Sequence, residues 1–374
     1  MNKLENYCLT TSVSSPTLVI DLDIVEENYK IFKNSLQDYK IHYAVKANPN
    51  LDVLKILVKL DSYFDVASGA EIKQCLKAGA DPKRLSFGST IKSIRDIKYS
   101  YKKGVTLFAA DSIEELEKIE KYAPGSDVFI RVLLGDTGAL RPLNKKFGCS
   151  TAMAEQLFDL AKNLNVNLVG LSFHIGSQTL HPHMWFDSLD IVSTLWNKLK
   201  KQGYNLRVLN IGGGFPSKYD EDITDIPTYC NIIKNTIQQK FGAIENIFAE
   251  PGRALVANSG IVIAESILVS KKDIIDTDTW LYLNIGRFGG LYSTDGEIFK
   301  YKITAPHSSG ENIPYIVAGP TLHSADILYE KYQPLLPKNI KSGDKILIYN
   351  TGSYTSVYST RFNGFSPIKT KVLK

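Results

Sequence analysis

The stretch IHYAVK at residues 41–46 is a short apolar run that predicts a β-strand ending in a lysine. Seven more runs rich in Val, Ile, Leu or Phe follow it, at 63–67, 84–87, 105–109, 127–134, 167–173, 207–211 and 246–250. Strands that are covered on both faces have this composition. Helix-like segments lie between them, such as 70–78, 112–122 and 152–163, and residues suited to helix N-caps precede these three: Ser68, Asp111 and Ser150. Eight strand–helix units in this length predict an α/β fold of the (β/α)8 TIM-barrel type, with an open doubly wound sheet as the alternative.

The pattern changes after residue 256. Strand-like runs at 261–270, 280–285, 313–317 and 345–350 have little helical periodicity between them. This predicts a separate, mostly-β domain. We therefore expect a barrel over residues 27–256 and a β-domain built from residues 1–26 and 257–374.

Composition bounds the functional class. The 374 residues exceed a usual single domain, and 44 Lys and Arg against 39 Asp and Glu give a net charge of +5. The basic residues are scattered as isolated pairs, which argues against a nucleic-acid or membrane surface. The four cysteines are far apart and predict neither a metal site nor disulfides. Because the start lacks a signal-like apolar segment and no stretch could span a bilayer, we expect a cytoplasmic protein.

Polar residues interrupt the apolar runs at or just after their C-terminal ends. Lys46 ends the first run and Asp65 lies near the end of the second. His174 follows the sixth, Gly212-Gly213-Gly214 the seventh, and Glu250 to Arg253 close the eighth. In a TIM barrel all these ends open on one face, where such folds carry their active sites. The convergence predicts an active site there.

Lys46 is the candidate for covalent chemistry. Most lysines are solvated surface charges. Lys46, however, ends a buried apolar run, where an unpaired ammonium would be costly. A buried lysine with a lowered pKa is suited to forming a Schiff base with a carbonyl compound.

The other strand-end residues each have two interpretations. Gly212–Gly214 could be a tight turn or, after strand seven of a barrel, a phosphate-binding loop that Arg253 supplements. Glu250 could cap a helix, form a salt bridge, or face the protonated nitrogen of a cofactor ring. His174 could be a core histidine or could stack on such a ring.

Nine motifs bring a family resemblance. The chain resembles the fold-type-III pyridoxal 5'-phosphate (PLP) decarboxylases of the ornithine/lysine/diaminopimelate group, which are built on an alanine-racemase-like barrel. The resemblance covers nearly the whole chain and is carried by YAVKANPN (43–50), FDVASGAE (64–71), FGSTIK (87–92), HIGSQ (174–178), GGGFP (212–216), EPGR (250–253), GPTLHSAD (319–326), GSYT (352–355) and FNGF (362–365). IGRFGGLY (285–292) and FNGF are most similar to bacterial ornithine/lysine decarboxylases.

The resemblance implies a role for each matching residue. Lys46 would carry PLP as a Schiff base, with Asp65 and Arg141 in the same site. His174 would stack on the ring, and Glu250 would pair with the ring nitrogen and so strengthen the electron sink for decarboxylation. The phosphate would be held by Ser177, Gly213, Gly214, Arg253 and Tyr354. The resemblance also implies a small amino-acid substrate and a homodimer whose shared active sites are completed by residues 319–326 of the second subunit.

The departures from the family concern the substrate. Where the family has a cysteine that helps protonate the product and an aspartate that binds the distal ammonium, this chain has Leu322 and His323. Two other positions where relatives place a carboxylate hold Ile285 and Ser293. Because such a pocket cannot pair with a free ammonium, the sequence favours a substrate whose distal amine is acylated.

The best candidate substrate is N-citryl-ornithine or a close analogue from carboxylate-siderophore biosynthesis. His323 would contact the acyl group or replace the cysteine as proton donor, and nearby Arg287 would pair with a tail carboxylate. An ornithine/lysine decarboxylase of polyamine biosynthesis is the first alternative. Diaminopimelate decarboxylation is less favoured because the CESGD-type segment is absent. The lost cysteine motivates a non-catalytic regulatory relative as another alternative, but the retention of Lys46, Asp65, Glu250 and the phosphate residues argues against it. An amino-acid racemase would usually place arginine, not Glu250, at the ring nitrogen.

Overall fold

The computed structural model describes residues 2–135, 137–141, 146–275 and 278–374. The chain forms two compact units. One comprises Glu26–Pro216 and Ile223–Leu255 and is called the barrel unit below. The other comprises Met1–Val25, Ser217–Asp222 and Val256–Lys374 and is called the β-unit. The short segment Ser217–Asp222 therefore belongs with the β-unit, although the sequence suggested an uninterrupted barrel domain.

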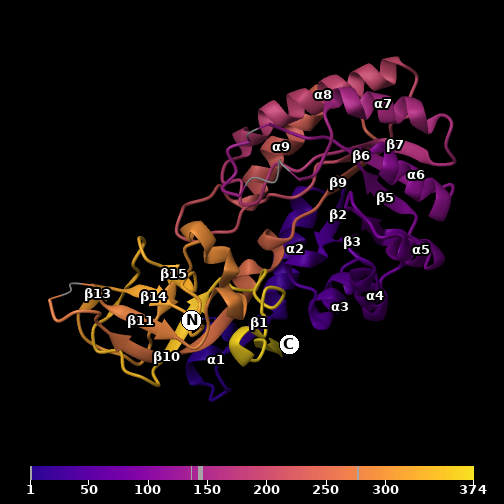
Figure 1. Cartoon of the computed structure of the whole chain (residues 1–374). Coiled ribbons are helices and arrows are strands. Elements are labelled where there is room, and N and C mark those ends of the chain that lie inside the picture. Colours follow the sequence, from indigo (N-terminus) through magenta and orange to yellow (C-terminus); the bar gives the residue numbers. More distant parts are fainter. Residues whose placement is uncertain (1, 136, 142–145, 276–277) are drawn as a thin grey trace. The chain divides into compact units, whose positions relative to one another are not determined.

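The barrel unit contains a closed barrel of eight parallel strands (Figure 1). The strands are β2 (Tyr39–Ala44), β3 (Tyr63–Val66), β4 (Leu85–Phe87), β5 (Leu107–Ala110), β6 (Asp127–Arg131), β7 (Asn167–Ser172), β8 (Val208–Asn210) and β9 (Asn246–Ala249). Strand β9 pairs with β2 and closes the ring. This confirms the (β/α)8 prediction and excludes the open doubly wound sheet.

Helices alternate with the barrel strands along the chain. They are α2 (Leu22–Ser35), α3 (Leu51–Lys59), α4 (Gly69–Ala78), α5 (Ile94–Lys102), α6 (Ile113–Tyr122), α7 (Thr151–Ala161), α8 (Phe186–Lys201), α9 (Ile226–Phe241) and α10 (Arg253–Val256). Ser68 and Ser150 cap α4 and α7 as predicted. The prediction for Asp111 was wrong, because Ser112 caps α6. The Asp111 carboxylate instead accepts the Gly148 N–H at 2.7 Å.

Apolar side chains from five strands fill the inside of the barrel. This core consists of Ala109, Phe129, Val169, Val208 and Phe248. The His42 ring is buried with them, 4.4 Å from the Phe248 ring. A filled barrel has no pore, so its chemistry is confined to the ends of the strands.

The β-unit is built around one eight-stranded sheet. Its central strand β10 (Gly260–Ser270) pairs antiparallel with β1 (Thr17–Asp21), β11 (Trp280–Leu283) and β17 (Lys345–Tyr349). The sheet also contains β12 (Ile303–Thr304), β14 (Ile316–Ala318), β15 (Ile327–Tyr329) and β18 (Lys369–Leu373). Helix α1 (Lys3–Thr10) packs on it through Leu4 and Cys8. A second, two-stranded sheet joins β13 (Asn312–Pro314) to β16 (Leu335–Pro337), so the predicted strand 313–317 is divided between two sheets.

Among the described residues, no helix has the length and apolar character needed to cross a membrane.

Candidate active site

The C-terminal mouth of the barrel collects six charged or polar side chains from six strands. Asp65 lies in β3, Arg131 ends β6 and Asn210 ends β8. Lys46, His174 and Glu250 each follow a strand end by one or two residues. Their charges interact: the pKa values of Asp65, Arg131 and His174 each respond to others in this set. The barrel thus brings together the predicted residues Lys46, Asp65, His174 and Glu250.

Lys46 is exposed, so the expectation of a buried ammonium was wrong. Strand β2 ends at Ala44, and Lys46 lies on a 3-10 turn, Val45–Ala47, in which both flanking residues are buried. The turn is fixed from one side because the Ala44 N–H donates to Pro251 O at 3.2 Å. The turn thus supports Lys46 firmly while its amine stays accessible to a carbonyl compound.

Asp65 is buried at 6% exposure, and its Oδ1 has no hydrogen-bond partner among the described residues. Gly88, after β4, closes over it so tightly that a Cβ on Gly88 would collide with Oδ1. Burial first and then the charge of Glu250 hold the pKa of Asp65 well above its usual range, while Lys46 lowers it. Asp65 therefore favours its protonated form more than an exposed aspartate does, although it is surrounded by charge.

Glu250 has an ordered neighbourhood. Its Oε1 accepts a hydrogen bond from Asn210 Nδ2 at 2.6 Å, and its backbone N–H donates to Gly212 O at 2.8 Å. Asn210 Oδ1 in turn accepts the Gly212 N–H at 2.9 Å. The carboxylate and the glycine loop are therefore held in one hydrogen-bonded unit.

The glycine loop 212–214 leaves no room for side chains. A Cβ on Gly213 would lie 2.6 Å from the Glu250 carbonyl oxygen. Gly212 and Gly214 adopt φ of +69° and +111°, which favours glycine. A backbone stripped of side chains at a strand end is a cradle for an anion such as a phosphate. Arg253, buried at 6% exposure, begins the short α10 after β9 and adds positive charge to the same end of the barrel.

His174 is a neutral imidazole. Burial, followed by the charges of Arg131 and Lys46, holds its pKa well below the usual value. Its Nδ1 accepts the Gly176 N–H at 2.9 Å, so the ring proton lies on Nε2. Ser177 and Arg141 exchange backbone hydrogen bonds of 2.9 and 3.2 Å, which ties the loop before Arg141 to the loop after β7. Residues 142–145, which follow Arg141, lie outside the described part of the chain.

Sequence reasoning missed Arg131, Asn210 and Glu71. Arg131 and Asn210 lay inside predicted strands and were treated as part of them. The signal was present, because a charged or amide residue near the C-terminal end of a barrel strand deserves the same attention as Lys46. Glu71 lies in the first turn of α4 and accepts the Ala67 N–H at 2.6 Å. Burial raises its pKa, and Lys46 opposes that rise.

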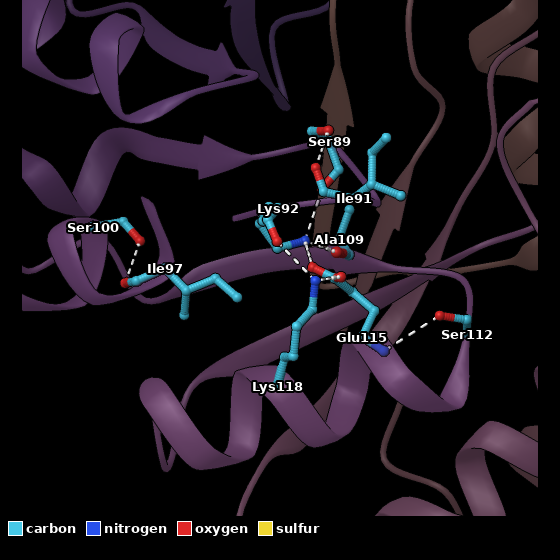
Figure 2. A network of polar contacts seen from close by, with 9 residues as sticks. All are labelled: Ser89, Ile91, Lys92, Ile97, Ser100, Ala109, Ser112, Glu115 and Lys118. Atoms are coloured by element: carbon cyan, nitrogen blue, oxygen red, sulfur yellow. Dashed lines mark hydrogen bonds and ion pairs between the residues drawn. The ribbon is translucent and has the colours of Figure 1, made fainter. Parts of the chain in front are cut away.

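A second charged cluster joins Lys92, in the loop after β4, to Glu115 and Lys118 in α6 (Figure 2). Lys92 has a fully buried side chain, and its Nζ lies 2.9 Å from Glu115 Oε1. It also donates to the carbonyl oxygens of Ser89 and Ala109, at 2.7 and 2.6 Å. Lys118 joins Glu115 at 2.6 Å and donates to Lys92 O at 2.7 Å. These contacts anchor the 88–93 loop, whose first residue covers Asp65.

The remaining predicted residues lie in the β-unit. Leu322 is 95% exposed, and its neighbour His323 packs against Phe288 and Phe362 at ring distances of 5.0 and 6.1 Å. Phe288 and Phe362, with Ile285, also line a cavity of about 110 Å³. Tyr354 lies in a turn with φ of +63°, and its ring stacks with that of Tyr358.

Arg287 is already engaged within the β-unit. Its Nη1 lies 3.2 Å from Asp295 Oδ1, and its backbone N–H donates to Asp326 Oδ1 at 2.7 Å. Its guanidinium is mostly buried, with the side chain 15% exposed. Any anion that it binds must compete with Asp295.

The mouth therefore offers an accessible amine, a carboxylate held by an amide, a neutral imidazole and an anion cradle. This donor set fits PLP, whose aldehyde, ring nitrogen and phosphate need such partners, and defines a PLP-dependent enzyme. A model of the family described as "Pyridoxal-dependent decarboxylase, pyridoxal binding domain" matches residues 22–257. The chain belongs to this family of pyridoxal-dependent decarboxylases.

Individual relatives agree over nearly the whole chain. The lysine/ornithine decarboxylase of Selenomonas ruminantium is 31% identical over 366 residues, covering 98% of this chain and 91% of that protein. The structure of SrLDC in complex with PLP and cadaverine superimposes with a TM-score of 0.89 at 29% identity, covering 100% of this chain and 94% of the other. The arginine decarboxylase of Paramecium bursaria Chlorella virus, bound to agmatine, gives a TM-score of 0.90 at 26% identity, covering 99% of both chains.

The protein is thus a PLP-dependent carboxy-lyase. Bound PLP supplies an electron sink for the bond that breaks when CO2 leaves. The chain contributes charged, neutral and proton-carrying side chains at fixed positions around the cofactor ring. The mouth provides the carboxyl group of Glu250, a neutral ring at His174 and, at Asp65, a buried carboxyl whose pKa is raised.

Proposed function

We propose that this decarboxylase acts on an amino acid whose distal amine is acylated, with N-citryl-ornithine or a close analogue of carboxylate-siderophore biosynthesis as the best candidate. The observation that carries this is the state of segment 319–326. Its one carboxylate is Asp326, which is buried at 3% exposure. Asp326 Oδ1 accepts the Arg287 N–H, and Oδ2 accepts both the Thr321 N–H and its hydroxyl, at 3.1 and 2.6 Å.

A free distal ammonium therefore lacks a partner in this segment. Asp326 is committed to backbone and hydroxyl donors that hold the turn. Ile285 and Ser293, at the other two positions where a carboxylate was sought, are buried at 1% and 2% exposure and carry no charge. Desolvating an ammonium without a carboxylate costs several kcal/mol, whereas an amide has no such charge to compensate.

His323 suits an acyl group. Its Nδ1 accepts the Ala325 N–H at 3.0 Å, so the neutral ring presents an Nε2–H donor. The ring is held by Phe288 and Phe362, and the residue is exposed. We assign His323 to an acyl carbonyl or to the proton-donor role of the missing cysteine, with Leu322 beside it as an apolar contact. Arg287 would bind a tail carboxylate by exchanging it for Asp295.

The proposal also assigns the cofactor contacts and the assembly. Lys46 attaches the cofactor, Glu250 meets the ring nitrogen and His174 stacks on the ring. Asp65 and Arg141 complete that site, and the phosphate is held by Ser177, Gly213, Gly214, Arg253 and Tyr354. We further propose a homodimer in which segment 319–326 of a second copy completes each active site. Full activity in a monomer would contradict this assembly.

A lysine or ornithine decarboxylase of polyamine biosynthesis is the second candidate. The names of the relatives favour it, since the lysine/ornithine decarboxylase of Selenomonas ruminantium matches 98% of the chain. In that case a carboxylate outside segment 319–326 would have to bind the ammonium. Asp295, with 47% of its side chain exposed, is one such group if Arg287 releases it.

Measuring CO2 release decides between the two candidates. The purified enzyme is supplied with PLP and with free ornithine, free lysine or N-citryl-ornithine. Because an unpaired ammonium loses a charged partner, we expect kcat/KM for N-citryl-ornithine to exceed that for ornithine by on the order of a thousandfold. Equal or better use of free ornithine contradicts the acylated substrate.

Variants of Arg287 refine the assignment. Arg287→Ala should impair the acylated substrate selectively, mostly through KM, because only that substrate has a tail carboxylate. Arg95→Ala is the matched control, since the Arg95 side chain is 90% exposed on the barrel unit. Equal losses on both substrates would place Arg287 outside the tail pocket.

A further inference from the structure

The mouth of the barrel contains two carboxyls, Asp65 and Glu250, and the charge of Glu250 raises the pKa of Asp65. Asp65 and Glu250 are close enough for the charge of Glu250 to be the second-largest influence on the ionisation of Asp65. Two like charges in a partly desolvated site do not both ionise readily, so one carboxyl tends to keep a proton. The carboxyl that carries the negative charge is the one that can pair with a protonated nitrogen of the cofactor ring.

Asn210 distinguishes the two carboxyls by its fixed polarity. The Gly212 backbone N–H can only donate, so the amide atom that faces it at 2.9 Å must be the acceptor Oδ1. The other end of the amide, Nδ2, then meets Glu250 Oε1 at 2.6 Å. Asn210 is 1% exposed, so water does not compete for either contact. An N–H that can only donate demands an accepting oxygen.

Asp65 lacks any such donor on one oxygen. Its Oδ1 has no hydrogen-bond partner among the described residues. The Gly88 N–H, in the loop that covers Asp65, donates to Val66 O at 3.1 Å. The loop therefore excludes water from Asp65 without replacing the hydrogen bonds that water would give an ionised carboxyl.

We propose that Asn210 is a positioning residue that assigns the charge of this pair, keeping Glu250 as the anion and leaving the proton on Asp65. Through Gly212, Asn210 also connects the Glu250 carboxylate to the glycine loop 212–214, so the two are fixed relative to each other. The high pKa of Asp65, caused first by burial and then by Glu250, agrees with this assignment.

The surrounding charges act on Asp65 in both directions. Arg131 interacts more strongly with Glu250 than with Asp65. Lys46 favours ionisation of Asp65, while Glu71 opposes it. His174 is neutral and adds no charge. The selective element is thus the single amide, supported by Arg131.

The inference concerns the chain before any substrate binds, and it deepens the cofactor role given to Glu250 in the proposed function. It can be tested without cofactor. The apoprotein is prepared with ¹³C-labelled Asp and Glu carboxyls, and its NMR spectrum is followed from pH 5 to 9. Wild type should show one Asp carboxyl that stays protonated near pH 7 and disappears in Asp65→Asn.

Asn210→Leu keeps the approximate size of the side chain and removes both polar ends. The proton should then be shared, with loss of about half or more of the protonated Asp65 signal and a new protonated Glu signal. That Glu signal should vanish when Glu250→Gln is added. Asn210→Ala serves if the leucine variant does not fold.

Asn284→Leu is the matched control. Asn284 bridges a backbone N–H and a hydroxyl in the β-unit, through Glu265 N at 3.0 Å and Ser15 Oγ at 2.8 Å. Its loss should leave the Asp65 signal unchanged. An ionised Asp65 in wild type, or a proton that stays wholly on Asp65 in both Asn210 variants, overturns the inference. A protein that shows this titration yet fails to bind PLP would instead contradict the proposed function.

Discussion

Two clusters of lysine and carboxylate lie at strand ends of the same barrel unit and are organised in opposite ways. In the cluster after β4, the Lys92 side chain is fully buried and contacts Glu115, which also contacts Lys118. At the mouth, Lys46 is exposed, and Asp65 is buried beside the like charge of Glu250. The first cluster is satisfied internally, whereas in the second Asp65 Oδ1 has no hydrogen-bond partner in the part of the chain that the structure describes.

The difference separates a structural use of charge from a chemical one. Buried charges that are fully paired hold a fold together and leave nothing for a ligand. Groups whose ionisation is perturbed and whose hydrogen bonds are incomplete are typical of functional sites. Burial alone is therefore a poor criterion for a reactive lysine in this protein. By that criterion Lys92 would be chosen, although its contacts with carbonyl and carboxylate oxygens make its amine inaccessible to a ligand.

Removing the mouth lysine should have the largest effect. Lys46→Ala should abolish the visible absorbance of the bound cofactor and lower turnover by on the order of ten-thousandfold, because covalent attachment is lost. Absorbance spectra and CO2 release measure this. Lys92→Met, in whatever fraction folds, should keep the absorbance. Retained absorbance in Lys46→Ala would mean that another lysine binds the cofactor.

Removing Lys92 should instead lower the free energy of unfolding. Lys92→Met leaves Glu115 buried with only Lys118, and breaking a buried pair costs about 3–5 kcal/mol of unfolding free energy. Urea unfolding of the barrel unit gives the value. Lys162→Met is a control, since Lys162 pairs with Asp159 on the surface with 59% of its side chain exposed, and should cost under about 1 kcal/mol. Similar losses for the two variants would remove the distinction between the clusters.

The cluster of Lys92, Glu115 and Lys118 should also make the free energy of unfolding vary with pH in the alkaline range. Burial first, against the opposing charge of Glu115, lowers the pKa of Lys92 from 10.5 to about 8. Between these values the unfolded chain holds more protons than the folded one, so stability rises with pH over that window, by about 3 kcal/mol in total. In Lys92→Met this rise should disappear. A wild-type protein that loses stability steadily from pH 8 to 10 would contradict the assignment.

Glu250→Ala should have the smallest effect of this set. The phosphate cradle and Lys46 remain, so the cofactor should stay bound, while turnover falls by about a hundredfold through kcat because the electron sink is weaker. Retained absorbance with lower kcat is the expected pattern. Unchanged turnover would remove Glu250 from the mechanism.

Much of the barrel could be predicted because its strands are continuous apolar runs. The exact ends could not, since local pattern does not show where pairing stops. The run 127–134 continues as Val-Leu-Leu, yet β6 ends at Arg131, and β2 ends before Lys46. Hydrogen bonding with neighbouring strands decides these ends.

The site was predictable where motifs carried it and hidden where contacts were distant. Lys92, in the loop after β4, and Glu115, in α6, are brought together only by the tertiary fold, which no local signal reports. Asn210 gained its meaning only when Glu250 and Gly212 were found at its two ends. Residue type fixes what a side chain can donate or accept, but partners come from the fold.

The comparison between the two lysines has one direct test. The protein is incubated with PLP, reduced with borohydride so that the lysine–cofactor bond becomes permanent, and digested for peptide mass spectrometry. The tag should appear on the peptide containing Lys46 and be absent from that containing Lys92. A tag on Lys92 or on any lysine other than Lys46 would contradict the assignment of the exposed mouth lysine as the attachment point.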